Sequence, residues 1–252
     1  MNCYNKFAHI YDKLIRADVD YKKWSDFIIE KCVENNLVFD DYLDLACGTG
    51  NLTENLCPKF KNTWAVDLSQ EMLSEAENKF RSQGLKPRLA CQDISNLNIN
   101  RKFDLITCCL DSTNYIIDSD DLKKYFKAVS NHLKEGGVFI FDINSYYKLS
   151  QVLGNNDFNY DDDEVFYYWE NQFEDDLVSM YISFFVRDGE FYKRFDEEHE
   201  ERAYKEEDIE KYLKHGQLNI LDKVDCYSNK KVEKFTERIT YLVKLGGKSN
   251  GR

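Results

Sequence analysis

The chain has 252 residues and a formal net charge of −12, with 42% hydrophobic, 15% aromatic and 32% charged residues. This length fits one large domain with a smaller elaboration, and the composition excludes an intrinsically disordered chain. The acidity argues against a protein that coats nucleic acid or anionic lipid through a broad basic surface.

The first part of the chain alternates apolar strand patterns with amphipathic helix patterns. Helices are expected at 18–36, at 51–57, from Ser69 to Gly84, and from Asp118 to Gly136. Strands are expected at 41–46, 63–68, 87–94, 103–110 and 138–143. This alternation is typical of a parallel sheet that is covered by helices on both faces.

The pattern changes near residue 150. Long, aromatic, alternating segments predict three antiparallel strands at 166–173, 177–187 and 190–204. This part of the chain is also acidic, because residues 149–215 carry −13 whereas residues 1–148 carry only −3. A helix at 205–216 and strands at 218–228 and 238–245 then resume the earlier pattern. The middle segment is therefore an insertion into one α/β domain.

The N-terminus has no apolar segment of the signal-peptide type, and no run approaches the roughly 20 apolar residues of a membrane span. The eight cysteines form no CxxC pair and no metal-finger spacing. We therefore expect a cytoplasmic protein with free thiols, without a metal site and without a membrane partner.

A glycine-containing turn follows the first predicted strand, in the segment DLACGTG from Asp44 to Gly50. Small residues at Ala46 and Gly48 allow a ligand to approach the backbone where the strand turns into a helix. A dinucleotide fingerprint would require a third glycine at position 53, which is Thr53, and the Lys-Ser or Lys-Thr pair of a phosphate loop is absent. The turn therefore favours an adenosyl ligand without an obligate pyrophosphate.

Acidic residues end the next two predicted strands. Asp67 lies 19 residues after Gly48, where a carboxylate accepts hydrogen bonds from both ribose hydroxyls of a nucleoside. Asp93 ends the third strand, where a carboxylate meets an exocyclic amine. Each acid alone is equally consistent with a helix cap, but together they share the edge at which open α/β sheets bind ligands.

With these motifs in place, the sequence resembles the class I S-adenosylmethionine-dependent methyltransferases. The resemblance is carried by DLACGTG, DLSQEM at 67–72, CQDI, FDLITCCLDSTNYI at 103–116 and LKEGGVFIFDIN at 133–144. The opening FAHIYDKLIRADVDYKKW is similar to a small-molecule subgroup with an N-terminal helical lid. Ala46 departs from the glycine of many members, and a methyl group is tolerable there.

The resemblance implies a Rossmann-like, doubly wound sheet of seven strands whose last strand is reversed, with a small antiparallel β cap after the fifth strand. It divides the chain into a lid and core at 1–144, a cap at 145–204 and a C-terminal completion of the sheet at 205–252.

The resemblance also assigns S-adenosyl-L-methionine as cofactor, with a binding role for each matched residue. Asp44, Ala46 and Gly48 would serve the methionine end, and Asp67 the ribose. Leu68, Met72, Asp93 and Ile94 would surround the adenine, and Cys109 would lie beside the sulfonium. The lid residues Tyr11 and Trp24 are candidate covers, although ordinary packing explains these aromatics equally well.

The reaction implied is an in-line displacement at the methyl group, in which the protein mainly positions the nucleophile. An oxygen or a protonated nitrogen acceptor needs a nearby base. The candidates are Tyr115, Tyr146 and His199, and the sequence does not choose among them. For His199 a structural position on a surface strand is the stronger interpretation.

The preferred acceptor is a small molecule that is neutral or cationic, because the acidic insertion would repel phosphate. An RNA-modifying methyltransferase is the alternative. Two other classes remain open, a nicotinamide-dependent oxidoreductase and a non-catalytic regulatory protein that binds the same cofactor. The oligomeric state is not readable from the sequence.

Overall fold

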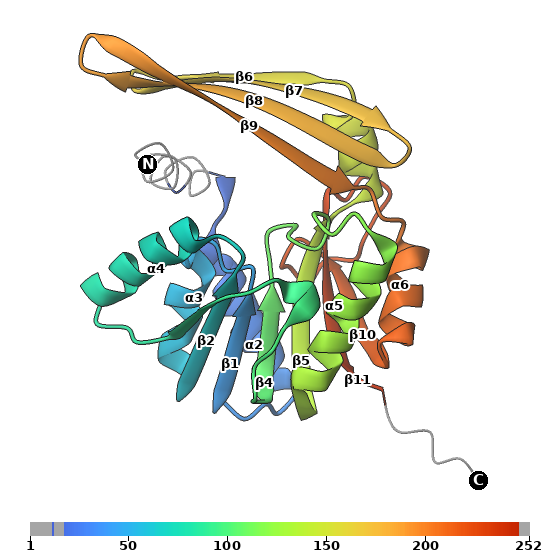
Figure 1. Ribbon diagram of the computed structural model, residues 1–252. Helices are drawn as coiled ribbons and strands as arrows, with labels where there is room; N and C mark the ends of the chain where they lie inside the picture. The colour runs from blue at the N-terminus through green and yellow to red at the C-terminus, as the bar shows by residue number, and fades with distance from the viewer. Residues whose placement is uncertain (1–11, 13–17, 247–252) are drawn as a thin grey trace.

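The computed structural model describes residue 12 and residues 18–246, and it contains two β-sheets (Figure 1). The larger one, called the core sheet below, has seven strands in the order β10-β11-β5-β4-β1-β2-β3. Its bounds are β1 Asp41–Leu45, β2 Asn62–Asp67, β3 Arg88–Cys91, β4 Phe103–Cys108, β5 Leu133–Asn144, β10 Leu218–Asp225 and β11 Arg238–Leu245.

Strands β1 to β5 pair in parallel, whereas β11 runs antiparallel to both of its neighbours, β5 and β10. The predicted fold class is therefore confirmed, including the reversed last strand.

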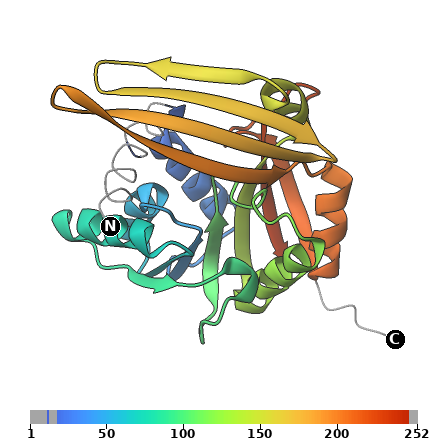
Figure 2. The same ribbon diagram turned by 45° about the horizontal axis from the view of Figure 1, so that its top comes forward.

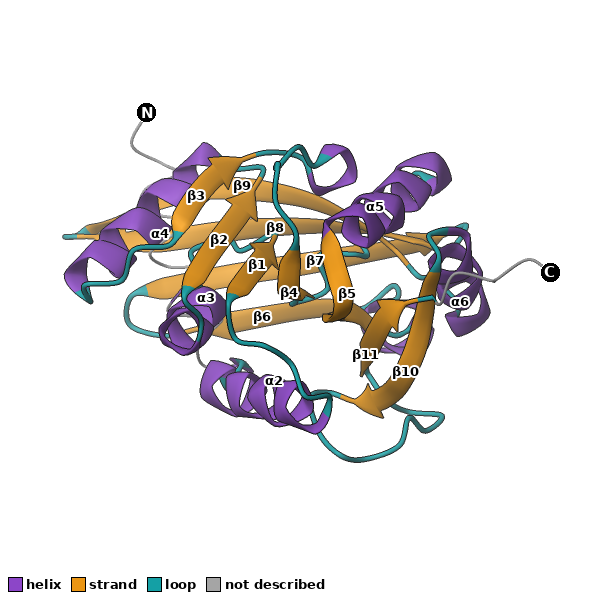
Figure 3. Cartoon of the chain, turned by 90° about the horizontal axis from the view of Figure 1, so that it is seen from below, coloured by secondary structure: helices purple, strands orange, loops and turns teal. Residues whose placement is uncertain are grey.

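Helices cover both faces of the core sheet, as Figure 3 shows from below. One face packs against α2 (Tyr21–Glu34) and α3 (Asn51–Leu56), and the other against α5 (Ser119–His132) and α6 (Glu206–His215). Helix α4 (Gln70–Ser82) lies beside β2 and β3. The 3₁₀ turns η1 (Cys57–Lys59) and η2 (Ile94–Asn96) complete this part.

Side-chain caps mark the starts of three of the expected helices. Side chains of Asp20, Ser69 and Asp118 accept hydrogen bonds from backbone N–H groups in the first turns of α2, α4 and α5. Such caps satisfy donors that have no partner inside the helix.

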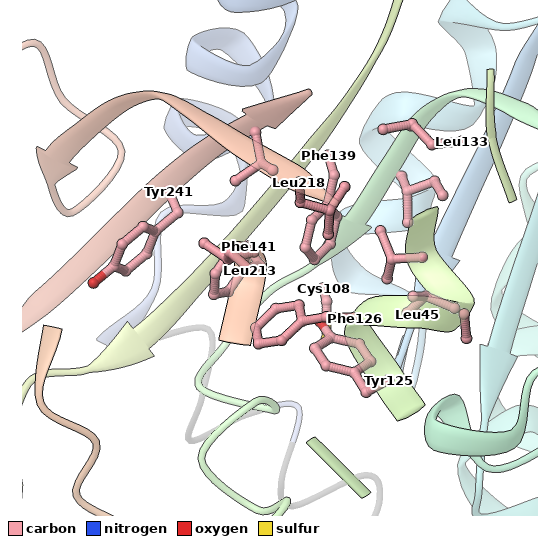
Figure 4. Close-up of a cluster of buried hydrophobic side chains, with 14 of the residues drawn as sticks. Leu45, Cys108, Tyr125, Phe126, Leu133, Phe139, Phe141, Leu213, Leu218 and Tyr241 are labelled. Atoms are coloured by element: carbon pink, nitrogen blue, oxygen red, sulfur yellow. The ribbon is translucent and has the colours of Figure 1, made fainter. Parts of the chain in front are cut away.

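The core between β5, β11, α5 and α6 is aromatic (Figure 4). Phe139, Phe141 and Tyr241 lie in a row across two strands, with neighbouring ring centroids 4.9 Å apart and rings nearly parallel. Burial of such large side chains supplies most of the free energy that holds a sheet against its helices.

The insertion forms a second, antiparallel sheet, called the cap sheet below, in the order β6-β7-β8-β9. It follows the π-helix η3 (Lys148–Leu153) and comprises β6 Asp157–Asp161, β7 Val165–Glu174, β8 Leu177–Asp188 and β9 Phe191–Arg202. Figures 1 and 2 show it lying across the carboxyl ends of the core strands.

Three local predictions are wrong. The cap sheet has four strands rather than three, because β6 is a polar, mostly exposed edge strand whose sequence DFNYD does not resemble a buried strand. Helix α5 ends at His132 and not at Gly136, and β5 starts directly after it. Strand β3 ends at Cys91 because η2 takes over the end of the predicted segment.

Gly137 is required for the packing of β5 and does not end helix α5. A Cβ atom on Gly137 would lie 2.9 Å from the carbonyl oxygen of Asp104 on the neighbouring strand β4. The close approach of the two backbones explains Gly137, whereas Gly136 has a φ angle of 80°, which favours glycine.

Candidate active site

A cavity of about 1120 Å³ is lined by residues at the carboxyl ends of the core strands and by residues of the cap sheet. Ligands of open α/β sheets bind at this edge. Ten of the eleven predicted cofactor residues line this one cavity: Trp24, Asp44, Ala46, Gly48, Asp67, Leu68, Met72, Asp93, Ile94 and Cys109. The eleventh, Tyr11, lies outside the described residues.

The glycine turn joins β1 to α3 through backbone that is mostly left-handed. Ala46, Gly48 and Gly50 have φ angles of 52°, 54° and 79°. A Cβ atom on Gly50 would lie 2.3 Å from Cζ of Phe80 in α4, so only glycine fits there. Ala46 takes a conformation that L-residues usually avoid, and such strain is typical of ligand-binding turns.

Asp67 connects the second strand to this turn. One carboxylate oxygen accepts the N–H of Gly48 at 2.7 Å, and the other accepts the N–H of Ser69 at 2.9 Å. Burial raises the pKa of this carboxyl above its usual range. Each carboxylate oxygen has two lone-pair sites, so the side chain keeps acceptor capacity for a ligand in the cavity.

Asp44 lies beneath the turn and is almost fully buried. Its carboxyl accepts hydrogen bonds from the hydroxyls of Thr53, at 2.5 Å, and Thr107, at 2.7 Å. Burial raises the pKa of Asp44 to about 6, and the two hydrogen bonds oppose that rise. Position 53 is thus a threonine rather than a glycine because its hydroxyl donates a hydrogen bond to Asp44, the acid beneath the turn.

The expected adenine residues lie on the more open side of the cavity. Leu68 is 72% exposed, and the Asp93 side chain caps η2 by accepting the N–H of Ser95 at 2.8 Å. Met72 and Ile94 line the cavity beside them. An exposed apolar side chain next to an exposed acid is suited to a flat, partly polar ligand.

Trp24 fits both interpretations made from the sequence, a cover of the cofactor and ordinary packing. It lines the cavity, yet it is 5% exposed and stacks on Tyr227 with ring centroids 4.2 Å apart. The guanidinium carbon of Arg238 lies 5.5 Å from its ring centroid. Trp24 is therefore a fixed part of the wall.

A buried ionic cluster, which sequence reasoning missed, shapes the loop after β4. Leu110 and Asp111 both have positive φ, and both donate their N–H groups to Asp142 at 2.8 Å. Arg238 forms ion pairs with Asp142 and, at 2.6 Å, with Asp111. Tyr227 also donates its hydroxyl to Asp142. The cluster holds the segment that follows β4 against the cavity.

Asp12 forms a second missed contact with the glycine turn. Its carboxylate pairs with Lys79 of α4 at 2.6 Å and accepts a hydrogen bond from the Asn51 side chain at 3.0 Å. The hydroxyl of Thr49 also donates to it. Both residues that flank Gly50 in the sequence are therefore tied to residue 12.

Of the three candidate catalytic residues, the structure brings two together. Tyr115 and His199 both line the cavity, with ring centroids 6.0 Å apart and nearly perpendicular rings. Burial lowers the pKa of His199, which favours its neutral form. The Tyr146 hydroxyl instead donates to Asp176 at 2.8 Å, and Tyr146 is not among the lining residues.

The cap sheet supplies a wall of the cavity that is almost entirely apolar or aromatic. This cap wall consists of Tyr167, Trp169, Met180, Ile182, Phe184, His199 and Glu201. Glu201 on β9 was also missed from the sequence, because it is one of several acids in FDEEHEER. It is 3% exposed, and burial followed by the charge of Asp111 raises its pKa to about 8.

The strand register explains which acids face the cavity. Alternate residues of β9 point inward, so Glu201 is buried, whereas the outward-facing Asp196, Glu198 and Glu200 are exposed. None of the nine acids at 149–186 lines the cavity. The cavity is nevertheless acidic, with eight Asp or Glu and two Lys or Arg among its lining residues.

Within the described ranges, no helix is long and apolar enough to cross a bilayer. The same part of the chain contains no cluster of three or more His, Cys, Asp or Glu side chains placed to hold a metal ion.

Comparison with known proteins gives one consistent result. A family model described as a methyltransferase domain matches residues 43–137. YqeM of Bacillus subtilis, a protein assigned to the methyltransferases, is 36% identical over 215 residues, which is 84% of this chain and 84% of YqeM.

Two of the solved structures that share this fold illustrate the similarity. DesVI from Streptomyces venezuelae superposes with a TM-score of 0.81 at 19% identity, covering 95% of this chain and 98% of DesVI. CalS10 from Micromonospora echinaspora, an amino pentose methyltransferase with bound S-adenosylmethionine, gives a TM-score of 0.74 at 15% identity, covering 93% and 95%.

Proposed function

As a member of the class I S-adenosylmethionine-dependent methyltransferase family, this chain binds that cofactor and transfers its methyl group, and we propose that the acceptor is a small molecule with a nitrogen or oxygen nucleophile. The cofactor supplies an electrophilic methyl group when bound. The protein then has to hold the cofactor, orient the acceptor and exclude water.

We assign cofactor binding to the core side of the cavity. The site suits the cofactor, because the Gly48 position has no neighbour within 4 Å of a built Cβ atom and so leaves room beside the turn. Asp67 presents a carboxylate for the ribose, and Leu68, Met72, Asp93 and Ile94 are grouped for the adenine. Cys109 and Asp111 would border the reacting end.

The enclosure of the cavity by the cap wall carries the proposal for a small acceptor. At about 1120 Å³ the cavity exceeds the usual volume of about 300–1,000 Å³ for a single small ligand. It therefore has space for a cofactor and a modest acceptor together. Tyr115 and His199 flank the acceptor side, and the acidic lining favours a neutral or cationic acceptor over a phosphate-rich one.

The amino pentose named for CalS10 supports the same class of acceptor. On this proposal, residues 1–144 and 205–252 form the cofactor-binding domain, and residues 145–204 form a cap that binds the acceptor.

A methyl-transfer screen tests this function. The purified protein is given cofactor labelled in the methyl group together with cell extract that is separated into small-molecule, RNA and protein fractions. We expect label in the small-molecule fraction, and loss of it with Asp67→Ala. Label found only in RNA or protein contradicts the proposal, and cofactor binding without any transfer identifies a regulatory protein instead.

A further inference from the structure

Glu201 is a buried carboxyl on the inner face of β9 that lines the cavity and has little compensation. Among the described residues, its one hydrogen bond comes from Asn144, whose Nδ2 donates to Glu201 Oε2 at 2.9 Å, and it forms no salt bridge. A buried carboxyl without a cationic partner destabilises a fold relative to an apolar side chain of similar size. Its position therefore points to a ligand that supplies the missing charge.

The position of Glu201 is fixed by backbone contacts of the two residues that follow it. Arg202 donates its N–H to the carbonyl of Asn114 at 2.8 Å, and its carbonyl accepts from the Asn114 side chain at 3.0 Å. Ala203 donates its N–H to the carbonyl of Asp176 at 2.8 Å. The end of β9 is thus held against the loop after β4, on the reacting side of the cavity.

The titratable groups around Glu201 come from four elements, and among the described residues none of them forms an ion pair with its carboxyl. Arg238 of β11 pairs with Asp111 and Asp142, and Lys148 of η3 donates to Oδ1 of the same Asn144 at 3.0 Å. Asp111, in the loop after β4, raises the pKa of Glu201, whereas Lys148 and Arg238 lower it. His199 lies on the same strand and face, and its burial lowers its pKa and favours the neutral imidazole.

We propose that Glu201 and Asn144 form an amine-recognition site, in which Glu201 binds the acceptor as an ammonium ion and removes one proton from its nitrogen. This inference rests on the proposed function and narrows its acceptor class to primary and secondary amines. An N–H bond of the ammonium ion breaks and an O–H bond forms on Glu201. The nitrogen keeps the electron pair that methylation requires, and the carboxyl returns its proton to water after the product leaves.

The apolar cap wall lowers the free energy required for this proton transfer. Burial raises the pKa of a carboxyl, and that of Glu201 is raised to about 8. Desolvation by the apolar side chains of the cap wall lowers the pKa of an alkylammonium ion from its usual value of about 10. The two values therefore approach one another, so the proton moves at little cost in free energy. In water, where they differ by about 6 units, a glutamate is too weak a base.

The test compares two probes of equal size, cyclohexylamine and cyclohexanol, by ligand-detected NMR on the full-length protein. We expect the wild type to bind the amine at least tenfold more tightly than the alcohol. Glu201→Gln should lose this preference, because it keeps the shape and a hydrogen-bonding amide but not the negative charge. Glu200→Gln, an equal charge change on the exposed outer face of β9, should retain it.

Equal binding of the two probes by the wild type, or binding of neither, overturns the inference. Survival of the amine preference in Glu201→Gln overturns it too. If Glu201→Gln does not fold, Glu201→Met is measured in its place, and the wild-type comparison stands without either variant.

Calorimetry with S-adenosylmethionine separates this inference from the proposed function. All variants should bind the cofactor with wild-type affinity, because Glu201 lies on the cap wall. Failure of the wild type to bind the cofactor would count against the proposed function, whereas intact cofactor binding without an amine preference would count against the role of Glu201 alone.

Discussion

The two sides of the cavity hold their buried carboxyls in different ways. On the core side, Asp44 accepts two threonine hydroxyls and has a pKa of about 6, whereas on the cap side Glu201 accepts one amide N–H and has a pKa of about 8. Both are almost fully buried, so burial does not distinguish them. They differ in their hydrogen-bond donors and in their charged neighbours, because Glu201 has one donor fewer and also feels the negative charge of Asp111. The carboxyl on the core side therefore has more hydrogen-bond partners within the protein than the carboxyl on the cap side.

The largest expected effect tests how strongly the core side depends on its ionic cluster. Arg238→Leu leaves Asp142 and Asp111 buried without their cation, and should lower the free energy of unfolding by about 3–5 kcal/mol. Arg194→Leu on the outer face of the cap sheet removes an exposed ion pair with Asp196 and should cost less than about 1 kcal/mol. Urea denaturation measures the free energy of unfolding of both variants. Equal losses of stability would contradict the difference between the core side and the cap side.

Cofactor affinity measured without an acceptor should depend on residues of the core side. Asp67→Ala should weaken S-adenosylmethionine binding by on the order of 100-fold, about 3 kcal/mol, because a charged acceptor for the ribose is lost. Asp93→Ala, at an exposed acid that already caps η2, should cost less than about tenfold. Isothermal calorimetry measures the cofactor affinity of both variants, and circular dichroism checks that they fold. Unchanged affinity in Asp67→Ala would remove this residue from the ribose role.

The pH dependence of stability should separate the two carboxyls. A raised native pKa favours the protonated form, so its contribution to stability is complete below the unfolded pKa and is lost as the pH rises through the native pKa. For Asp44 this loss spans about pH 4 to 6 and amounts to about 2–3 kcal/mol. For Glu201 it extends from about pH 4.5 to about 8.

Asp44→Asn and Glu201→Gln should each abolish the corresponding part of this loss. The stability of either variant relative to the wild type should therefore increase with pH, levelling off near pH 6 for Asp44→Asn and near pH 8 for Glu201→Gln. Thermal unfolding between about pH 4 and pH 9 tests this, and identical profiles would contradict the contrast between the two carboxyls.

The smallest expected effect concerns an indole on the cap side. Nε1 of Trp169 is buried and has no hydrogen-bond partner among the described residues. Trp169→Phe removes that unsatisfied donor along with some packing, so stability should change by less than about 1 kcal/mol. Trp24→Phe on the core side, where the ring stacks on Tyr227, should cost about 1–2 kcal/mol. Thermal unfolding that ranks the two in the opposite order would break the comparison.

The cavity residues of the core side could be predicted from the sequence because they lie at strand ends that are close to one another along the chain. Gly48 and Asp67 follow consecutive strands, and parallel strands place their carboxyl ends at one edge. Arg238 was not predictable, because it reaches Asp142 from 96 residues away across a sheet order that the pattern does not specify. Glu201 was hidden for another reason: an alternating strand buries one acid and exposes the next, and the register depends on pairing with β8.

Asn114 contacts both sides of the cavity at once. Its fully buried side chain accepts the N–H of Asn144 at the end of β5 and donates to the carbonyls of Asn144 and Arg202, and its own N–H binds the carbonyl of Asp111. A ligand that displaced β9 would therefore also act on the loop that borders the other ligand. Such a linkage is reciprocal: the factor by which the cofactor changed acceptor affinity would equal the factor by which the acceptor changed cofactor affinity.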